Sequence, residues 1–318
     1  MITLPDFRQK QILFIKTESG VLNKIKIYND NIVFEKDERV ENRVSCHRIF
    51  SVFIIGNISI TSELIKKGLK YGISFFLLDN SFRCYASIGA KNSGNYLLKM
   101  RQYFFSDDFD LKFSKSLVLN KIENQLRLLK SRGKLISRTK QEIRNLINQA
   151  ENLETLRGIE GNFSKEFFSA YFKEIGWFAR MPRVKPDAVN FLLDMGYTLL
   201  FNFIDALLNL FGFDTYKGFY HKLFFQRKSL SCDIIEPFRC IVDREVLKIF
   251  NLKIFNEKDF KAKDSKVYML YSKSTKYASV FLETIMKNKE EIYKYIRDFY
   301  HFVMDSEKYN FPYFKVSR

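Results

Sequence analysis

Short apolar stretches separated by turn residues fill the first part of the chain. Ile, Phe and Val gather in runs of strand length, with Gly, Asn or Asp between them. These runs predict strands at residues 11–16, 24–27, 31–35, 49–55, 73–78 and 84–88. Between the fourth and fifth runs, Thr61 can cap a helix whose apolar face ends before Gly72. The pattern predicts a small β-sheet domain that contains one helix.

After Tyr96 the apolar residues recur every three or four positions, which indicates helices. One helix has readable ends, because Pro186 and Asp187 precede its apolar stripe and Gly212 follows it. The last residues, 305–318, mix aromatic side chains with a proline and resemble a tail, which is usually disordered unless a partner covers it.

The change of pattern also predicts the domain organisation. A polar, glycine-containing segment at residues 91–94 is the best boundary. We expect residues 1–92 to form the β-rich domain and residues 93–318 to form a larger, all-α domain that carries the catalytic site. The predicted fold class is therefore α+β with two domains.

Basic residues outnumber acidic ones, with 53 Lys and Arg against 36 Asp and Glu, for a net charge of +17. Such a charge attracts polyanions, of which nucleic acid is the commonest and an anionic membrane the second. The most apolar stretch, residues 195–204, is shorter than the roughly 20 residues that cross a bilayer. We therefore expect a buried helix there and no membrane partner.

The four cysteines include no C-x-x-C pair, so the usual zinc and redox spacings are absent. Cysteines of this kind are typical of packing residues in a reducing compartment. The first residues are followed by a charged segment and show no secretory pattern. These features predict a cytoplasmic protein.

Ten cations and only two acids, Glu123 and Glu142, lie between Lys112 and Arg144. This segment is either a solvated face of a helical hairpin or a surface that contacts phosphates. No pattern of base-reading residues stands out, which favours recognition of DNA shape and backbone.

One of the three histidines has acidic residues close by in the sequence. His221 precedes Asp233 and Glu236, which are three positions apart and share a side if the segment is helical. His47 and His301 lie among strand and aromatic residues and are interpreted as structural. The residues alone thus make a metal site at His221 plausible and leave open which acid completes it.

Several segments resemble, in order, the motifs of the CRISPR-associated integrase family, the first protein of the spacer-acquisition complex. The segment 156–161 is similar to the family's glutamate motif, residues 185–200 to its central helix, and residues 218–221 to its histidine motif. Residues 229–244 resemble the acidic motif, and residues 101–103 and 121–125 the opening helices of the same domain.

The resemblance implies a metal site made of Glu160, His221 and Glu236, with Asp233 as a nearby catalytic acid that can exchange roles with Glu236. Two carboxylates and an imidazole suit Mg²⁺ or Mn²⁺ and leave positions for water and phosphate. Such an ion assists attack of a DNA 3′-hydroxyl on a phosphodiester.

Basic residues near these motifs are the expected phosphate contacts. Alternatively, the basic residues around the acidic motif are surface cations or ion-pair partners of Asp233 and Asp243. The predicted contacts with DNA are Arg180, Arg183, Lys185, Lys228, Arg239 and Arg244.

The resemblance further implies partners: double-stranded DNA, both prespacer and CRISPR repeat, a second copy of the chain through the sheet domain, and a small dimeric second CRISPR-associated protein. Two other functions stay open. One is a metal-dependent endonuclease of branched DNA that uses the same ligands for hydrolysis. The other is a non-catalytic nucleic-acid scaffold, for which the basic segment would suffice.

Overall fold

The computed structural model describes residues 3–89, 94–134, 136, 138–177, 179–182, 184–221 and 224–317. Its strands are β1 Gln11–Lys16, β2 Asn23–Tyr28, β3 Asn31–Lys36, β4 Arg39–Ser45, β5 Ile49–Ile55, β6 Ser59–Ile60, β7 Ser74–Leu78, β8 Cys84–Ile88, β9 Phe260–Lys263 and β10 Lys266–Met269. Its α-helices are α1 Leu4–Arg8, α2 Ser62–Lys70, α3 Tyr96–Tyr103, α4 Asp107–Ser131, α5 Lys140–Gln149, α6 Leu153–Tyr171, α7 Ala188–Phe211, α8 Ser229–Ile234, α9 Arg239–Asn251, α10 Ser274–Lys287 and α11 Lys289–Met304.

The N-terminal strands form two four-stranded sheets, in the orders β1-β5-β7-β8 and β4-β3-β2-β6. Strand β5 is buried along its whole length and lies parallel to both β1 and β7. Its side chains alternate between two cores, because successive residues of a strand point to opposite faces. Val52 and Ile54 pack with the second sheet and α2, whereas Phe53 and Ile55 pack with the helices.

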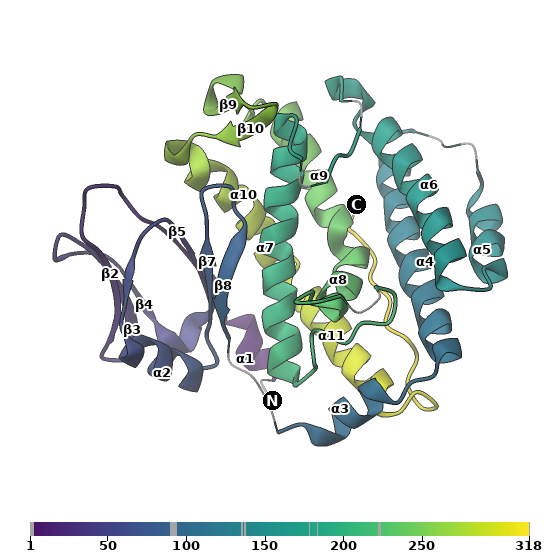
Figure 1. Cartoon of the computed structure of the whole chain (residues 1–318), viewed down its shortest axis with the longest axis horizontal. Helices are drawn as coiled ribbons and strands as arrows, with labels where there is room; N and C mark the ends of the chain where they lie inside the picture. The colour runs from purple at the N-terminus through teal and green to yellow at the C-terminus, as the bar shows by residue number, and fades with distance from the viewer. Residues whose placement is uncertain are drawn as a thin grey trace.

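The helical part covers the other face of the first sheet (Figure 1). Phe7 of α1 stacks on Tyr293 of α11 at 4.9 Å, and Phe50 of β5 meets Phe203 of α7 at 5.3 Å between ring centroids. One hydrophobic core therefore runs from the first sheet through α7 to α4 and α9. The predicted order, strands first and helices after, is confirmed. The predicted boundary at residues 92 and 93 lies outside the described residues and stays a prediction.

Helix α7 is the central element of the helical part (Figure 1). The side chain of Asp187 caps its first turn by accepting from the Asn190 N–H at 2.7 Å, and Gly212 ends it with a φ of 93°. By length and composition α7 is long enough to cross a membrane, which corrects the shorter apolar run read from the sequence. Because 83% of its most apolar window is buried inside the protein, α7 is a core helix.

The structure departs from the sequence-based prediction mainly at three places. Strands β4 and β6 were not predicted, since β4 is a polar edge strand with mostly exposed side chains and β6 has only two residues. The helical part is not all-α, because β9 and β10 form an antiparallel hairpin. Asp264 and Ser265 form its two-residue turn with φ values of 51° and 58°. Strand β9 carries no apolar run, and the apolar run of β10 is only three residues long.

The third departure is the C-terminal segment, 305–317, which is packed and not free. Phe314 is buried against Phe238, with ring centroids 4.5 Å apart. Its backbone N–H donates to Asn120 of α4 at 2.9 Å, and the Val316 N–H donates to Asn124 at 3.0 Å. The protein itself thus buries Phe314, one of the aromatic residues that the tail prediction left for a partner, whereas Tyr309 and Tyr313 stay exposed.

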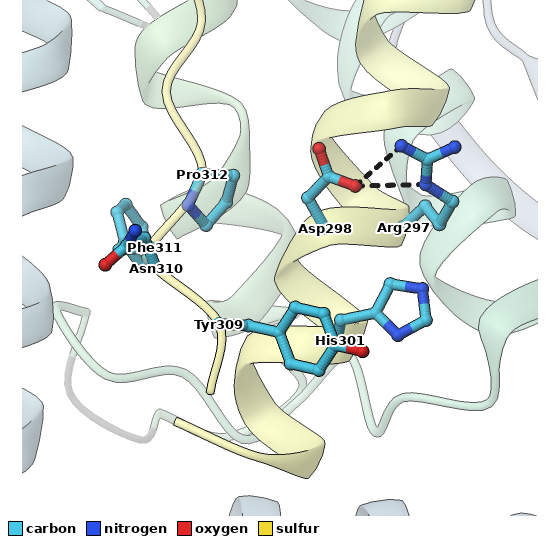
Figure 2. Close-up of a pocket in the computed structure, with 7 residues that line it drawn as sticks. All are labelled: Arg297, Asp298, His301, Tyr309, Asn310, Phe311 and Pro312. Atoms are coloured by element: carbon cyan, nitrogen blue, oxygen red, sulfur yellow. Dashed lines mark hydrogen bonds and ion pairs between the residues drawn. The ribbon is translucent and has the colours of Figure 1, made fainter. Parts of the chain in front are cut away.

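Between α11 and this segment lies a surface hollow of about 520 Å³ (Figure 2). Arg297 and Asp298 pair at its rim, and His301 stacks on Tyr309 with ring centroids 5.1 Å apart. The stacking agrees with the structural interpretation of His301. The hollow contains none of the predicted site residues, so the chemistry of the chain has to be sought elsewhere.

Candidate active site

Three elements bring two of the predicted ligands together around a lysine. Glu160 lies on α6, Glu236 begins the 3₁₀ turn Glu236–Phe238, and both face α4, which packs against these elements. Lys121 of α4 donates to Glu160 Oε1, and its Nζ lies 2.7 Å from Glu236 Oε2. Ser164, one turn after Glu160 on α6, donates to the same Oε1 at 2.8 Å.

The carboxylate of Glu236 is buried among cations. Arg239 Nε donates to its Oε1 at 3.0 Å and lies over the ring of Tyr197, with the guanidinium 4.6 Å from the ring centroid. Oε2 is buried and, among the described residues, makes no aligned hydrogen bond, so its contact with Lys121 is a charge contact. Burial opposes ionisation here, but Arg239, Lys121 and His221 outweigh it and lower the pKa of Glu236 to about 2.

His221 is held by Asp233. The Nδ1 atom of His221 lies 2.5 Å from Asp233 Oδ1, which also accepts from the His221 backbone N–H at 2.9 Å. Asp233 Oδ2 accepts from the backbone N–H groups of Phe219 and Tyr220 at 2.7 and 3.1 Å. A carboxylate on Nδ1 fixes the tautomer that leaves Nε2 as the nitrogen for a ligand.

Gly218 allows the chain to wrap around Asp233 in this way. A Cβ atom at this position would lie 2.7 Å from Asp233 Oδ2 and 2.8 Å from the backbone of Ser229. Neither neighbour can move, because Asp233 and Ser229 are fully buried. Gly218 therefore lets the loop at 218–221 approach Asp233 closely, because it has no Cβ atom.

The structure gives different surroundings to the two acids that the sequence left interchangeable. Both oxygens of Asp233 accept hydrogen bonds from the loop, and the residue has no exposed surface. Glu236 instead turns toward Glu160 across Lys121. Within the described ranges, no group of three or more His, Cys, Asp and Glu side chains is gathered closely enough to hold a metal ion. Two of the predicted ligands, Glu160 and Glu236, thus meet at the Lys121 ammonium, and His221 acts on Glu236 through its charge.

A family model described as CRISPR associated protein Cas1 matches residues 17–283, which include all of these side chains. The chain belongs to the Cas1 family. This confirms the resemblance seen in the ordered motifs.

Curated Cas1 proteins are similar over most of their length. A protein named CRISPR-associated endonuclease Cas1 1 of Thermodesulfovibrio yellowstonii is 31% identical over 244 residues, covering 72% of this chain and 77% of that one. One named CRISPR-associated endonuclease Cas1 2 of Rhodospirillum rubrum is 31% identical over 263 residues, covering 75% of each.

Solved structures share the fold. A casposase bound to an integration product has a TM-score of 0.82 at 22% identity, covering 97% of this chain and 95% of that one. A Cas1 protein from Thermotoga maritima has a TM-score of 0.82 at 17% identity, with coverage of 97% and 100%. A chain of a Cas6-RT-Cas1–Cas2 complex has a TM-score of 0.81 at 22% identity, with coverage of 97% of this chain and 36% of that one.

The cations predicted to contact DNA in this Cas1 protein are mostly engaged with the protein itself. Arg180 pairs with Asp194, Lys228 with Asp205 at 2.7 Å, and Arg239 with Glu236. Lys185 donates to the Ser81 carbonyl at 2.8 Å, and Arg244 donates to the Ser317 carbonyl at 2.6 Å. Arg183 lies outside the described residues. The alternative from the sequence paired these cations with Asp233 and Asp243. Lys228 and Arg244 instead contact Asp205 and Ser317.

The basic segment between Lys112 and Arg144 likewise contains cations that pair within the protein, together with others that are exposed. Lys121 is buried in the site, and Lys140 and Arg144 both pair with Glu123, at 3.1 and 2.6 Å. Lys112, Lys130 and Arg138 are exposed. The segment therefore offers a smaller cationic surface than its composition suggested.

Sequence reasoning missed the position of Lys121, which it counted as one surface cation among ten. A polar run at residues 120–125 inside an otherwise amphipathic helix was the available signal, because buried polar residues require partners. It also missed the open side of α6. Among the described residues, a Cβ atom on Gly158 or Gly161 would meet no neighbouring element within 4 Å, so the side of α6 that carries these two glycines is open to a ligand.

Proposed function

We propose that this Cas1 protein is a CRISPR adaptation integrase. It would insert spacer DNA into the repeat array by metal-dependent transesterification, in which a DNA 3′-hydroxyl attacks a repeat phosphodiester. Family membership and relatives named endonucleases support chemistry on phosphodiesters. The casposase of similar fold was solved with an integration product, which supports joining over hydrolysis alone.

The observation that carries the proposal is the arrangement of Glu160, Glu236 and His221. The donor types suit Mg²⁺ or Mn²⁺, because two carboxylates meet at one ammonium and an imidazole of fixed tautomer acts on Glu236 through its charge. One oxygen of Glu236 is buried and, among the described residues, lacks an aligned hydrogen bond. When bound there, a divalent cation would supply Lewis acidity for the phosphoryl group and the attacking hydroxyl.

The chain's own residues would then prepare the site. Asp233 holds the His221 ring in one orientation, and Arg239 keeps Glu236 ionised. No nucleophilic side chain is required, because one phosphodiester is exchanged for another.

We also propose the partners that the resemblance implied: prespacer and repeat DNA, a second copy of the chain, and the small dimeric second CRISPR-associated protein. The net charge of +17 supports DNA, and a chain of similar fold belongs to a complex whose name includes Cas2. A cytoplasmic location is part of the same proposal.

The test is a joining assay with a labelled 3′-hydroxyl duplex, a repeat-containing plasmid, Mn²⁺ and the partner protein. We expect the wild type to join ends, and Glu160→Gln and His221→Ala to abolish joining while DNA binding is retained. Glu154→Gln, exposed on the same helix, and His47→Ala, exposed in the sheet domain, are the matched controls and should join normally.

Two outcomes would contradict the proposal. If the wild type only nicks the plasmid, and nicking depends on His221, the chain is a metal-dependent endonuclease of branched DNA. If it binds DNA but neither joins nor nicks, and His221→Ala changes nothing, it is a scaffold.

A further inference from the structure

A buried lysine lies where a divalent cation would have to bind. Lys121 is 9% exposed, and its ammonium contacts one oxygen of Glu160 and one of Glu236. The three side chains come from α4, α6 and the turn that follows α8, so the contact joins three separate parts of the fold. Burial opposes the charge on Lys121, but Glu160 and Glu236 outweigh it and raise its pKa.

Without this ammonium the site would hold uncompensated negative charge. Glu236 would keep Arg239 as its only cation in direct contact among the described residues, and Glu160 would keep the neutral hydroxyl of Ser164. Unpaired buried carboxylates are strongly unfavourable in a protein interior. Lys121 therefore lets the site fold in the absence of metal.

A bound metal ion and this ammonium compete for the same oxygens. Mg²⁺ lies about 2.1 Å from its oxygen ligands, so a lysine Nζ at hydrogen-bond distance from the same two oxygens would lie within roughly 4 Å of the ion. Two like charges at such a separation repel each other in a partly buried site. The lysine stem has four rotatable carbons, so the ammonium can move aside while its helix stays in place.

We propose that Lys121 is a resident counter-ion of the Cas1 active site that a divalent cation must displace. This inference rests on the proposed metal dependence and adds to it. In this inference a single side chain, Lys121, keeps the predicted ligands Glu160 and Glu236 apart. Because Lys121 competes with the metal ion, it lowers the affinity of the site for metal. Because it neutralises the two carboxylates, it raises the stability of the metal-free protein.

The first experiment compares Lys121→Met with the wild type by calorimetric titration with Mn²⁺, in the absence of DNA. Lys115→Met is the matched control, because Lys115 lies on the same helix and, among the described residues, donates only to the Asn148 carbonyl, at 2.8 Å. We expect Lys121→Met to bind Mn²⁺ at least about tenfold more tightly than the wild type. The control should bind as the wild type does.

Thermal unfolding of the same proteins gives a second readout. In EDTA, Lys121→Met should unfold at a lower temperature than the wild type, and Mn²⁺ should raise its Tm by more than it raises that of the wild type. If the variant folds only when Mn²⁺ is present, the ion has replaced the ammonium, which also supports the inference.

A third measurement uses the wild type alone. Acylation of lysine amines, read by mass spectrometry, should be slow at Lys121 in EDTA and several-fold faster with Mg²⁺, with Lys115 unchanged. Equal or weaker Mn²⁺ binding by Lys121→Met, or acylation of Lys121 that metal does not accelerate, would overturn the inference and leave the proposed function intact. Absence of metal binding in both wild type and variant would overturn both.

Discussion

Replacing Asp233 by Asn tests whether this residue positions His221 or binds metal itself. The carboxylate accepts four N–H groups, three from the backbone of residues 219–221 and one from the His221 ring. An amide can accept at only one of its two terminal atoms. The substitution keeps the size of the side chain, so the effect reports on hydrogen bonds and charge.

The magnitude follows from which oxygen is lost. If the amide nitrogen takes the place of Oδ2, Phe219 and Tyr220 each lose an acceptor. If it takes the place of Oδ1, the His221 backbone loses one, and Nδ1 of the ring must accept instead of donate. A hydrogen bond to a charged group contributes about 1.5–3 kcal/mol, so the loss of one or two lowers the free energy of unfolding by roughly 2–5 kcal/mol.

The second arrangement also affects function, because a ring that accepts at Nδ1 carries its proton on Nε2 and cannot bind metal there. Loss of a carboxylate partner of a metal-binding histidine typically reduces metal affinity or activity by about 10- to 100-fold. We therefore expect weaker Mn²⁺ binding and slower joining in Asp233→Asn. Glu236→Gln, which removes a proposed ligand, should abolish detectable Mn²⁺ binding.

Urea unfolding measures the stability and calorimetry the Mn²⁺ affinity. Asp298→Asn is the control, since this acid pairs with Arg297 at the surface and should change stability by less than about 1 kcal/mol. An Asp233→Asn protein as stable as the wild type would refute the hydrogen-bond reasoning. Loss of Mn²⁺ binding in Asp233→Asn but not in Glu236→Gln would reverse the two roles.

Three further outcomes are expected. Burial raises the pKa of Asp243 from 3.8 to about 7, so the folded state binds this proton more tightly than the unfolded state, and its contribution to stability falls as pH rises from about 4 to 7. Asp243→Asn removes that fall, and urea unfolding at several pH values should show the variant gaining on the wild type across this window by up to about 4 kcal/mol. Phe314→Ala removes a buried ring that holds the C-terminal segment, and should lower the free energy of unfolding by about 3–5 kcal/mol in the same assay. Replacing the exposed cations Lys112, Lys130 and Arg138 by Gln should weaken DNA binding. The slope of log K against log salt concentration should become shallower by about 0.9 for each phosphate that the protein no longer neutralises. An unchanged slope would show that this face does not touch DNA.

Local signals predicted most of the fold. The bounds of β1, β5 and β8 agree with their apolar runs, and the caps of α2 and α7 lie at Thr61 and Asp187 as expected. These features depend on neighbours in sequence, since strand period, caps and C-terminal glycines act within one turn or one strand. Strands β4 and β9 were missed because polar side chains alternate with few apolar ones, and β6 and β10 because their apolar runs are too short to predict a strand.

The candidate site shows the same division. The ordered motifs identified Glu160, His221, Asp233 and Glu236, and Cas1 family membership confirms the resemblance on which they rest. The exchange of roles between Asp233 and Glu236 stayed open, because three residues of spacing cannot say which carboxylate faces the loop and which faces another helix.

The sequence by itself determined a basic protein with strands first and helices after, and the order of its motifs. Only the tertiary structure decided what surrounds each charge. Lys121 stands 39 positions before Glu160 and 115 before Glu236, and no local pattern relates it to either. Packing of α4 against α6 and the turn at Glu236 buries the three charges together, and burial makes pairing compulsory because an isolated charge in a protein interior is too unfavourable to persist.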